Sequence, residues 1–406
     1  MATEDGYAEA VMAQPYSGER WKMGVMVEAD PPHRINTVLL GRSPLPVTTP
    51  EGSDADIADK IVAYAGRLAE RELFSGAVLV ARHGAVLAQG AFGLANRDFG
   101  LANTLETRFN VASLSKSWTA IAIAQLVEAG ELDFDDPVAR FVTYPDAKAA
   151  NAMQIKHLLS HTAGLGTYFN ARLQEKARHL VRTVDDYLSL TEGEPPAFVP
   201  GERWDYSNTG MVLLGKIIEI VTGRTYFEQV KSAIFAPAGM ETAEFLYLDE
   251  VNDQVAVGYT RHWTLDGPRW TNNIFENFVG GCPAGGGYGT VQDIHRFAEA
   301  LKSGRLVSAE MVKLLTTAKP ELNSEHYGYG FSIHPERKLH GHSGGMLGCS
   351  SNLDMTLDPD GWTIAILAND LGMRPVALTA RQLIGVTVPE ADEARSYLPR
   401  GGMTAR

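Results

Sequence analysis

The sequence predicts an α+β fold, in which an antiparallel sheet is flanked by helices and carries an inserted, mostly helical lobe. Two hairpin patterns predict the sheet. The first joins residues 75–82 to 85–90 across His83-Gly84, and the second joins residues 352–357 to 362–367. Because the hairpins lie near opposite ends of the chain, we expect both ends to build one sheet. Residues of about 117–290 between them have mostly helical patterns and form the predicted lobe.

The remaining elements are predicted from apolar periodicity and from Gly and Pro breaks. Residues 1–50 are rich in Pro and contain one short strand-like piece, 23–28, so they are predicted to be an N-terminal extension, either packed on the main body or left from a small preceding domain. The main domain is expected over 51–390, followed by a polar tail over 391–406. The predicted helices and the extended segment are 54–73, 120–128 ending at Gly130, 153–165 ending at Gly164, 211–221 closed by Gly223, 291–301, 327–333 (extended) and 376–384.

Composition and charge exclude several classes of function. The chain has 406 residues and a formal net charge of −13, which disfavours binding to a phosphate backbone. No apolar run reaches the ~18 residues of a membrane span, and the first residues lack the pattern of a secretory signal. We therefore expect a cytoplasmic protein that binds neither nucleic acid nor membrane.

The cysteines and histidines give no pattern of metal ligands. Cys282 and Cys349 are the only cysteines, so no disulfide framework is predicted, and both are expected to be small, partly buried side chains. His157 and His161 are four residues apart without a carboxylate at a suitable offset, so both are predicted to be structural. The sequence predicts no metal and no cofactor.

The candidate nucleophile lies just before the helix predicted at 120–128. Ser113 and Lys116 form an S-x-x-K pair, and at this spacing two helical residues share a face. Ser113 is expected in the first helical turn, where free N–H groups favour a developing oxyanion. A buried ammonium beside a serine can activate a weak nucleophile. The alternative is a serine N-cap with an incidental lysine, because S-x-x-K alone is a weak signal.

Two further segments strengthen this hypothesis. Tyr206-Ser207-Asn208 and then Gly341-His342-Ser343-Gly344-Gly345 follow in chain order. Together the three motifs resemble the S-x-x-K, Y-x-N and [K/H]-x-G motifs of the serine β-lactamase and penicillin-binding-protein superfamily. The resemblance covers roughly residues 54–388 and is greatest to class C β-lactamases, serine D,D-carboxypeptidases and D-aminopeptidases, and family VIII carboxylesterases. It implies a β-lactamase/transpeptidase-like fold.

The resemblance also implies roles for individual residues. Ser113 is the implied nucleophile, Lys116 the charged neighbour that eases deprotonation, and Tyr206 the general base and later the proton donor. The backbone N–H groups of Ser113 and Gly345 are the implied oxyanion hole. Asn208 is expected to bond Lys116 or substrate, or to be a helix N-cap. His342, Ser343 and Gly344 are expected to line the cleft.

Residues 341–345 also match G-x-S-x-G, the nucleophile elbow of α/β-hydrolases. That elbow requires a helix after the serine and a histidine further along the chain. A strand pattern follows Ser343, and no histidine occurs after His342. Residue order therefore disfavours Ser343 as the nucleophile.

The third motif guides the choice of substrate. It reads His-Ser-Gly, whereas the resemblance implies Lys-Thr-Gly for true β-lactamases. We therefore expect a serine hydrolase that forms an acyl-enzyme with small carboxylic esters, and weak β-lactamase activity stays open. The alternatives are a D-amino-acid peptidase or amidase, an acyltransferase and, disfavoured by the intact motif set, a non-catalytic ligand-binding protein. The expected partner is a small ester or amide, and a homo-oligomer stays open.

Overall fold

The computed structural model describes residues 7–13, 20–27, 35–42, 50–143, 147–265, 267–334, 339–357 and 361–386. The polar tail predicted over 391–406 lies outside these residues.

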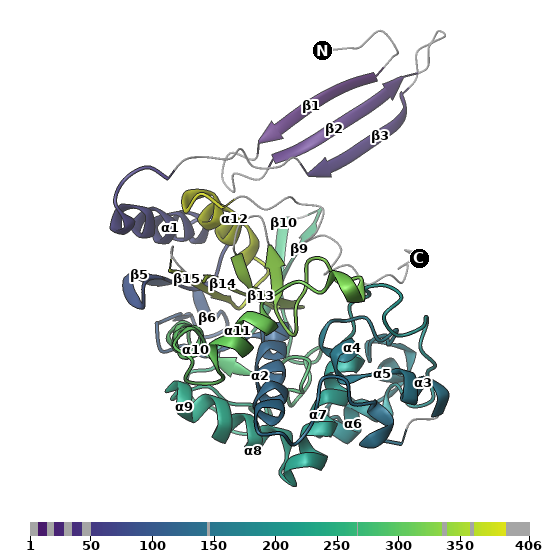
Figure 1. Cartoon of the computed structure of the whole chain (residues 1–406). Helices are drawn as coiled ribbons and strands as arrows, with labels where there is room; N and C mark the ends of the chain where they lie inside the picture. The colour runs from purple at the N-terminus through teal and green to yellow at the C-terminus, as the bar shows by residue number, and fades with distance from the viewer. Residues whose placement is uncertain are drawn as a thin grey trace.

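A six-stranded antiparallel sheet forms the centre of the main body, in the order β12-β13-β14-β15-β4-β5 (Figure 1). The first predicted hairpin is confirmed as β4 and β5, with His83 and Gly84 at positive φ in the turn. The second is confirmed as β14 and β15. Because β15 pairs with β4, the two ends of the chain do build one sheet. The strands are β4 (Gly76–Arg82), β5 (Ala85–Phe92), β12 (Ser332–His334), β13 (Leu339–Met346), β14 (Cys349–Thr356) and β15 (Trp362–Ala368).

Helices cover both faces of this sheet (Figure 1). The helices are α1 (Asp54–Ala69), α2 (Ser115–Glu128), α3 (Ala147–Ala152), α4 (Ile155–Leu159), α5 (Ala171–Glu175), α6 (Val184–Ser189), α7 (Asn208–Thr222), α8 (Tyr226–Val230), α9 (Ala236–Ala238), α10 (Val291–Lys302), α11 (Ala309–Leu315) and α12 (Met373–Leu383). On one face, Val78 and Ile364 are buried in a core shared with α1 and α12. On the other face, Leu79 and Leu367 are buried in the core that contains α2 and the lobe. Successive strand residues point to opposite faces, so β4 and β15 each contribute to both cores.

The lobe contains α2 to α9 and is mostly helical, with small strand pairs in and beside it. These short strands are β6 (Leu94–Asn96), β7 (Leu101–Ala102), β8 (Phe109–Asn110), β9 (Tyr259–Thr264), β10 (Gly267–Asn272) and β11 (Tyr288–Gly289). α2 is the central helix of the lobe, and most of its residues are buried on every side. A helix that is apolar all round is typical of a core position.

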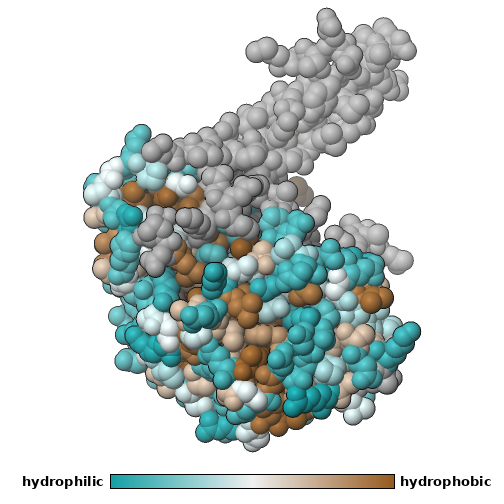
Figure 2. Space-filling view, viewed as in Figure 1, coloured by the Kyte–Doolittle hydropathy of each residue, from teal (hydrophilic) through white to brown (hydrophobic). Residues whose placement is uncertain are grey.

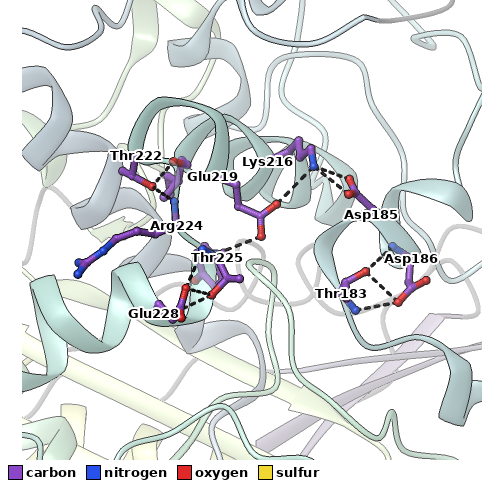
Figure 3. Close-up of polar contacts among 11 residues, drawn as sticks. Thr183, Asp185, Asp186, Lys216, Glu219, Thr222, Arg224, Thr225 and Glu228 are labelled. Carbon is purple, nitrogen blue, oxygen red and sulfur yellow. Dashed lines mark hydrogen bonds and ion pairs between the residues drawn. The ribbon is translucent and has the colours of Figure 1, made fainter.

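Helix caps and ion pairs fix α7 against its neighbours (Figure 3). Lys216 on α7 bonds Asp185 on α6 at 2.8 Å and contacts Glu219 at 3.5 Å. Glu219 in turn accepts a hydrogen bond from the backbone N–H of Tyr226 in α8 at 3.1 Å. Gly223 ends α7 in the left-handed region at φ 67°, as predicted. These contacts orient the helix whose N-terminal end carries the Tyr-x-Asn motif.

Residues 1–50 contain more strand than the sequence predicts. A three-stranded antiparallel sheet forms from β1 (Tyr7–Ala13), β2 (Arg20–Val27) and β3 (Ile35–Arg42), and it stands apart from the main body (Figure 1). The sequence predicted only the central strand. Residues 35–40 also contain strand-forming Ile, Thr and Val, but the prolines on either side of them favoured an extension without further strands. Edge strands take their conformation from pairing, which single-sequence propensity does not contain.

Three predicted elements are clearly shorter in the structure than the sequence indicates. The helix expected to Leu73 ends at Ala69. The segment 153–165 forms a helix only over Ile155–Leu159, far short of Gly164, and the extended segment at 327–333 is reduced to β12. Tertiary contacts replace regular structure in these segments; for example, the Gly330 N–H donates to the carbonyl of Leu159.

The visible face of the body is mostly hydrophilic, with smaller apolar patches (Figure 2). No helix in the described ranges is long and apolar enough to cross a membrane.

A buried ion pair joins α12 to the sheet. Arg381 donates to both carboxylate oxygens of Asp354, at 2.7 and 2.9 Å, and both side chains are about 5% exposed or less. Arg381 also donates to Asn352 Oδ1 at 3.2 Å. The pair therefore connects α12 to β14, the neighbour of the strand that carries the third motif.

Replacing Arg381 with Met is expected to lower the free energy of unfolding by about 3–5 kcal/mol, because Asp354 would remain buried without its partner. Arg140→Met breaks an exposed pair with Asp136 and is expected to cost at most about 1 kcal/mol. Urea unfolding followed by circular dichroism measures both. Equal losses in the two variants would contradict this account.

Candidate active site

Ser113 lies in a short turn between β8 and α2. Residues Ala112–Leu114 form one turn of 3-10 helix, and α2 begins at Ser115, earlier than the run predicted from residue 120. Ser113, which was expected in the first turn of this helix, lies just before it. Ala112, just before the serine, has φ 46°. This left-handed conformation is uncommon for alanine, and it turns the backbone sharply at the serine.

Hydrogen bonds from several segments hold this turn. Asn110 Oδ1 accepts from the Ala112 N–H at 2.8 Å, and the Val111 N–H donates to the carbonyl of Gly287 at 2.8 Å. The Ser351 hydroxyl, on β14, donates to the Val111 carbonyl at 2.6 Å. A strained backbone conformation is stable where surrounding contacts hold it in place, and these hydrogen bonds hold the conformation of Ala112.

Lys116 projects from the first turn of α2 towards Ser113. Its Nζ donates to Ser113 Oγ at 3.0 Å and also to the carbonyl of Ala284. The lysine is fully buried, whereas Ser113 is partly accessible. Burial lowers the pKa of Lys116 to about 7, because the desolvated ammonium is disfavoured. The amine therefore changes protonation state near neutral pH.

Tyr206 lies in the loop before α7, with its ring beside the same lysine. Lys116 Nζ is 4.9 Å from the centroid of the half-buried Tyr206 ring. The ring of His161 packs on Tyr206 with a centroid distance of 4.4 Å. The structure thus brings together Ser113 from the turn before α2, Lys116 from the first turn of α2, and Tyr206 from the loop before α7.

Asn208 is not the N-cap of α7. The cap is Ser207, whose Oγ accepts from the Gly210 N–H at 2.9 Å, and Asn208 is the first helical residue. The Asn208 amide donates to Thr167 Oγ1 at 3.0 Å, while the Lys116 ammonium donates to Ser113 and Ala284. Asn208 thus links the Tyr206 loop to the segment at Thr167. Ser207 is the cap because its backbone is still extended, at φ −125° and ψ 119°, whereas Asn208 already has helical conformation.

The third motif lies on β13, beside the serine turn. A Cβ on Gly344 would lie 2.6 Å from both the Ser113 nitrogen and the Val111 oxygen, so only glycine allows this approach. Gly345 is the next residue and is exposed. Ser343 is in the middle of a strand that continues through a hairpin into β14, which excludes the strand-to-helix elbow at this serine.

His342 is buried and neutral. Its Nδ1 lies 2.6 Å from the Ser343 carbonyl and therefore donates, so Nε2 accepts from the Tyr327 hydroxyl at 2.9 Å. Burial, aided by the Lys116 charge, lowers the pKa of His342 to about 3. This residue therefore gives the cleft no positive charge near neutral pH.

Several residues of the site were absent from the sequence analysis. Asn110, Ala284, Ser351 and Tyr327 each bond a site residue or its turn. The run Gly285-Gly286-Gly287 was the one available signal, since it approaches the serine turn and Trp118 closely. The others come from distant segments, and no local pattern distinguishes them.

The described residues contain no cluster of three or more His, Cys, Asp or Glu side chains that could hold a metal. Cys282 and Cys349 are both free and buried. The Tyr168 hydroxyl lies 3.4 Å from Cys282 Sγ, and burial raises the pKa of this thiol. Both cysteines thus remain protonated near neutral pH.

Comparison with known proteins identifies the family. The chain is 32% identical over 307 residues to penicillin-binding protein 4* of Bacillus subtilis, covering 72% of this chain and 67% of that protein. It is 29% identical over 267 residues to esterase EstB of Burkholderia gladioli, covering 58% and 67%. A D-stereospecific amidohydrolase from a Streptomyces species superimposes with a TM-score of 0.63 at 25% identity, covering 80% of this chain and 98% of that one. The Beta-lactamase family model matches residues 60–387, and the chain belongs to this family of serine hydrolases.

Proposed function

We propose that this enzyme hydrolyses small, uncharged carboxylic esters through an acyl-enzyme on Ser113. The burial of His342, with Nδ1 on the Ser343 carbonyl and Nε2 on the Tyr327 hydroxyl, is the observation that supports an ester substrate most directly. In the third motif, a cationic residue would favour a substrate carboxylate, as in a β-lactam. A histidine whose pKa is about 3 supplies no such charge.

The acylation step uses the Ser113–Lys116 contact. Neutral Lys116 accepts the Ser113 proton as Oγ attacks the ester carbonyl carbon, and the N–H groups of Ser113 and Gly345 stabilise the oxyanion. The bond to the leaving alkoxide then breaks, and Tyr206 donates the proton that makes it an alcohol. The family resemblance implies Tyr206 as the general base. The 3.0 Å contact between Lys116 Nζ and Ser113 Oγ, together with the lowered pKa of Lys116, favours the lysine as first proton acceptor.

Deacylation repeats the same chemistry with water. Lys116 first passes its extra proton to the deprotonated Tyr206, which restores both groups. A water molecule then attacks the acyl carbon and loses a proton to Lys116. The bond to Ser113 Oγ breaks, Tyr206 protonates this oxygen, and the carboxylic acid is released. An alcohol or amine that replaced this water would give the acyl transfer left open by the sequence. The shape of the cleft decides between the two acceptors.

Amide hydrolysis is a second candidate, supported by the similarity to the D-stereospecific amidohydrolase. An amine leaving group needs a proton more than an alcohol does, and Tyr206 beside Lys116 can supply one. The esterase EstB and neutral His342 favour the ester. A ratio of ester to D-alanine p-nitroanilide turnover ranks the two, with a chromogenic cephalosporin as the β-lactam probe.

Ser113→Ala is expected to lower kcat for p-nitrophenyl butyrate by at least about 10³-fold, since the nucleophile is removed. Ser343→Ala, in the neighbouring strand, is the matched control and is expected to keep the acyl-enzyme chemistry. Steady-state kinetics and trapping of the acyl-enzyme by mass spectrometry measure both. An active Ser113→Ala with an inactive Ser343→Ala would place the nucleophile on β13 and overturn the proposal.

The kcat/KM for esters is expected to rise with pH, with a midpoint near 7. Lys116 must lose its proton to act as base, and its pKa is lowered to about 7, so activity is low below this pH and reaches a plateau above it. His342→Gln is expected to leave the midpoint unchanged, because the histidine is already neutral there. A profile that falls above pH 7 would show that the charged ammonium is required instead.

A further inference from the structure

We propose that His161 is a positioning residue that holds Tyr206 in its place beside Lys116. This inference rests on the proposed function, because it takes Tyr206 to be the group that transfers a proton. The sequence analysis treated His161 as a structural histidine. Its contacts are concentrated on the two peptide units around Tyr206.

His161 itself is rigidly placed. It is fully buried in the turn after α4, with φ 60° in the left-handed region. The adjacent Ser160 carbonyl accepts from the Ser324 hydroxyl at 3.2 Å, and the two hydroxyls of Ser160 and Thr162 are 2.9 Å apart. The turn is thus bonded both internally and to a distant segment.

From this turn, His161 bonds the residues on both sides of Tyr206. Its backbone carbonyl accepts from the Asp205 N–H at 2.8 Å. Its Nδ1 accepts from the Ser207 N–H at 3.3 Å. The first bond holds the peptide between Trp204 and Asp205, and the second holds the peptide between Tyr206 and Ser207. Together they restrain the short backbone segment from which the tyrosine side chain projects.

The imidazole also contacts the tyrosine ring directly. The centroids of the His161 and Tyr206 rings are 4.4 Å apart. The imidazole centroid is also 4.6 Å from the centroid of the Tyr327 ring and 6.2 Å from that of Trp204. Tyr327 in turn bonds His342. A continuous row of four rings therefore connects Tyr206 to the third motif.

His161 does not carry protons in this arrangement. Burial and the charge of Lys116 hold its pKa well below the usual range, so it is neutral at working pH. Because Nδ1 accepts, the proton of the neutral ring is on Nε2, which has no hydrogen-bond partner within the described chain. An unsatisfied buried N–H costs free energy, and the contacts with the Tyr206 loop offset that cost.

The test compares two replacements that tolerate a positive φ. His161→Gly removes the ring and the Nδ1 acceptor without backbone strain. His161→Asn keeps an acceptor, because Asn Oδ1 and His Nδ1 are both bonded to Cγ, and asparagine often adopts the left-handed region. We expect His161→Gly to lower kcat about 100-fold with little change in KM, since a misplaced catalytic group costs about this much. We expect His161→Asn to recover most of this loss.

His157→Ala is the matched control. His157 is also buried, and its Nδ1 likewise accepts a backbone N–H, that of Gln154 at 3.0 Å, but it is four residues away from His161 and bonds no neighbour of Tyr206. Thermal unfolding measures the stability lost in each variant. His157→Ala is expected to lose stability and keep kcat.

A double-mutant cycle with Tyr206→Phe separates positioning from general damage. If His161 acts through Tyr206, His161→Gly adds little further loss of kcat in the Tyr206→Phe background. Independent, multiplicative losses would overturn the proposal, as would a folded His161→Gly with wild-type kcat.

If the glycine variant does not fold, the asparagine variant decides, and a folded His161→Asn with a 100-fold loss of kcat overturns the inference. A fully active Tyr206→Phe would instead refute the proton-transfer role of Tyr206 in the proposed function.

Discussion

The burial of one ammonium group at Lys116 is the constraint on which the rest of the site depends. Within the described chain, no carboxylate forms an ion pair with Lys116, and its partners are a hydroxyl and a backbone carbonyl. Taking a charge out of water without an ionic partner is costly, and the result is a pKa of about 7. The lysine then exists in part as a free amine at neutral pH. Burying this lysine lowers the stability of the fold, but it provides a base at the place where the proposed reaction needs one.

The elements that exclude water from Lys116 also position the other residues of the site. α2 is buried on all sides, so it can hold the lysine at the junction of the lobe and the sheet. The strand β13 closes on the serine turn because Gly344 has no side chain, and the segment Gly285–Gly287 approaches the turn from the lobe. The loop before α7 brings Tyr206. The site thus lies between the helical lobe and the sheet, and each element contributes one group.

Polar contacts among backbone groups make this site rigid. The serine turn has a left-handed alanine held by Asn110 and Ser351, and the tyrosine loop is held by a left-handed histidine. In both places a strained residue precedes or supports a group proposed to react. Such strain is stable only when surrounding bonds over-determine it. Catalytic geometry here depends on residues that do not themselves react.

The sequence by itself determined the fold class, the two hairpins that join the chain ends, and the S-x-x-K, Y-x-N and H-x-G motifs. These depend on local periodicity, turn residues and spacing, which are properties of short segments. Tertiary structure decided the start of α2 after Ser113, the cap at Ser207 in place of Asn208, the edge strands β1 and β3, and the partners of Lys116 and His342. It also showed that His161, which was predicted only to be structural, bonds both neighbours of Tyr206. Desolvation, positive φ and long-range hydrogen bonds arise only when distant segments pack together, so no window of sequence contains them.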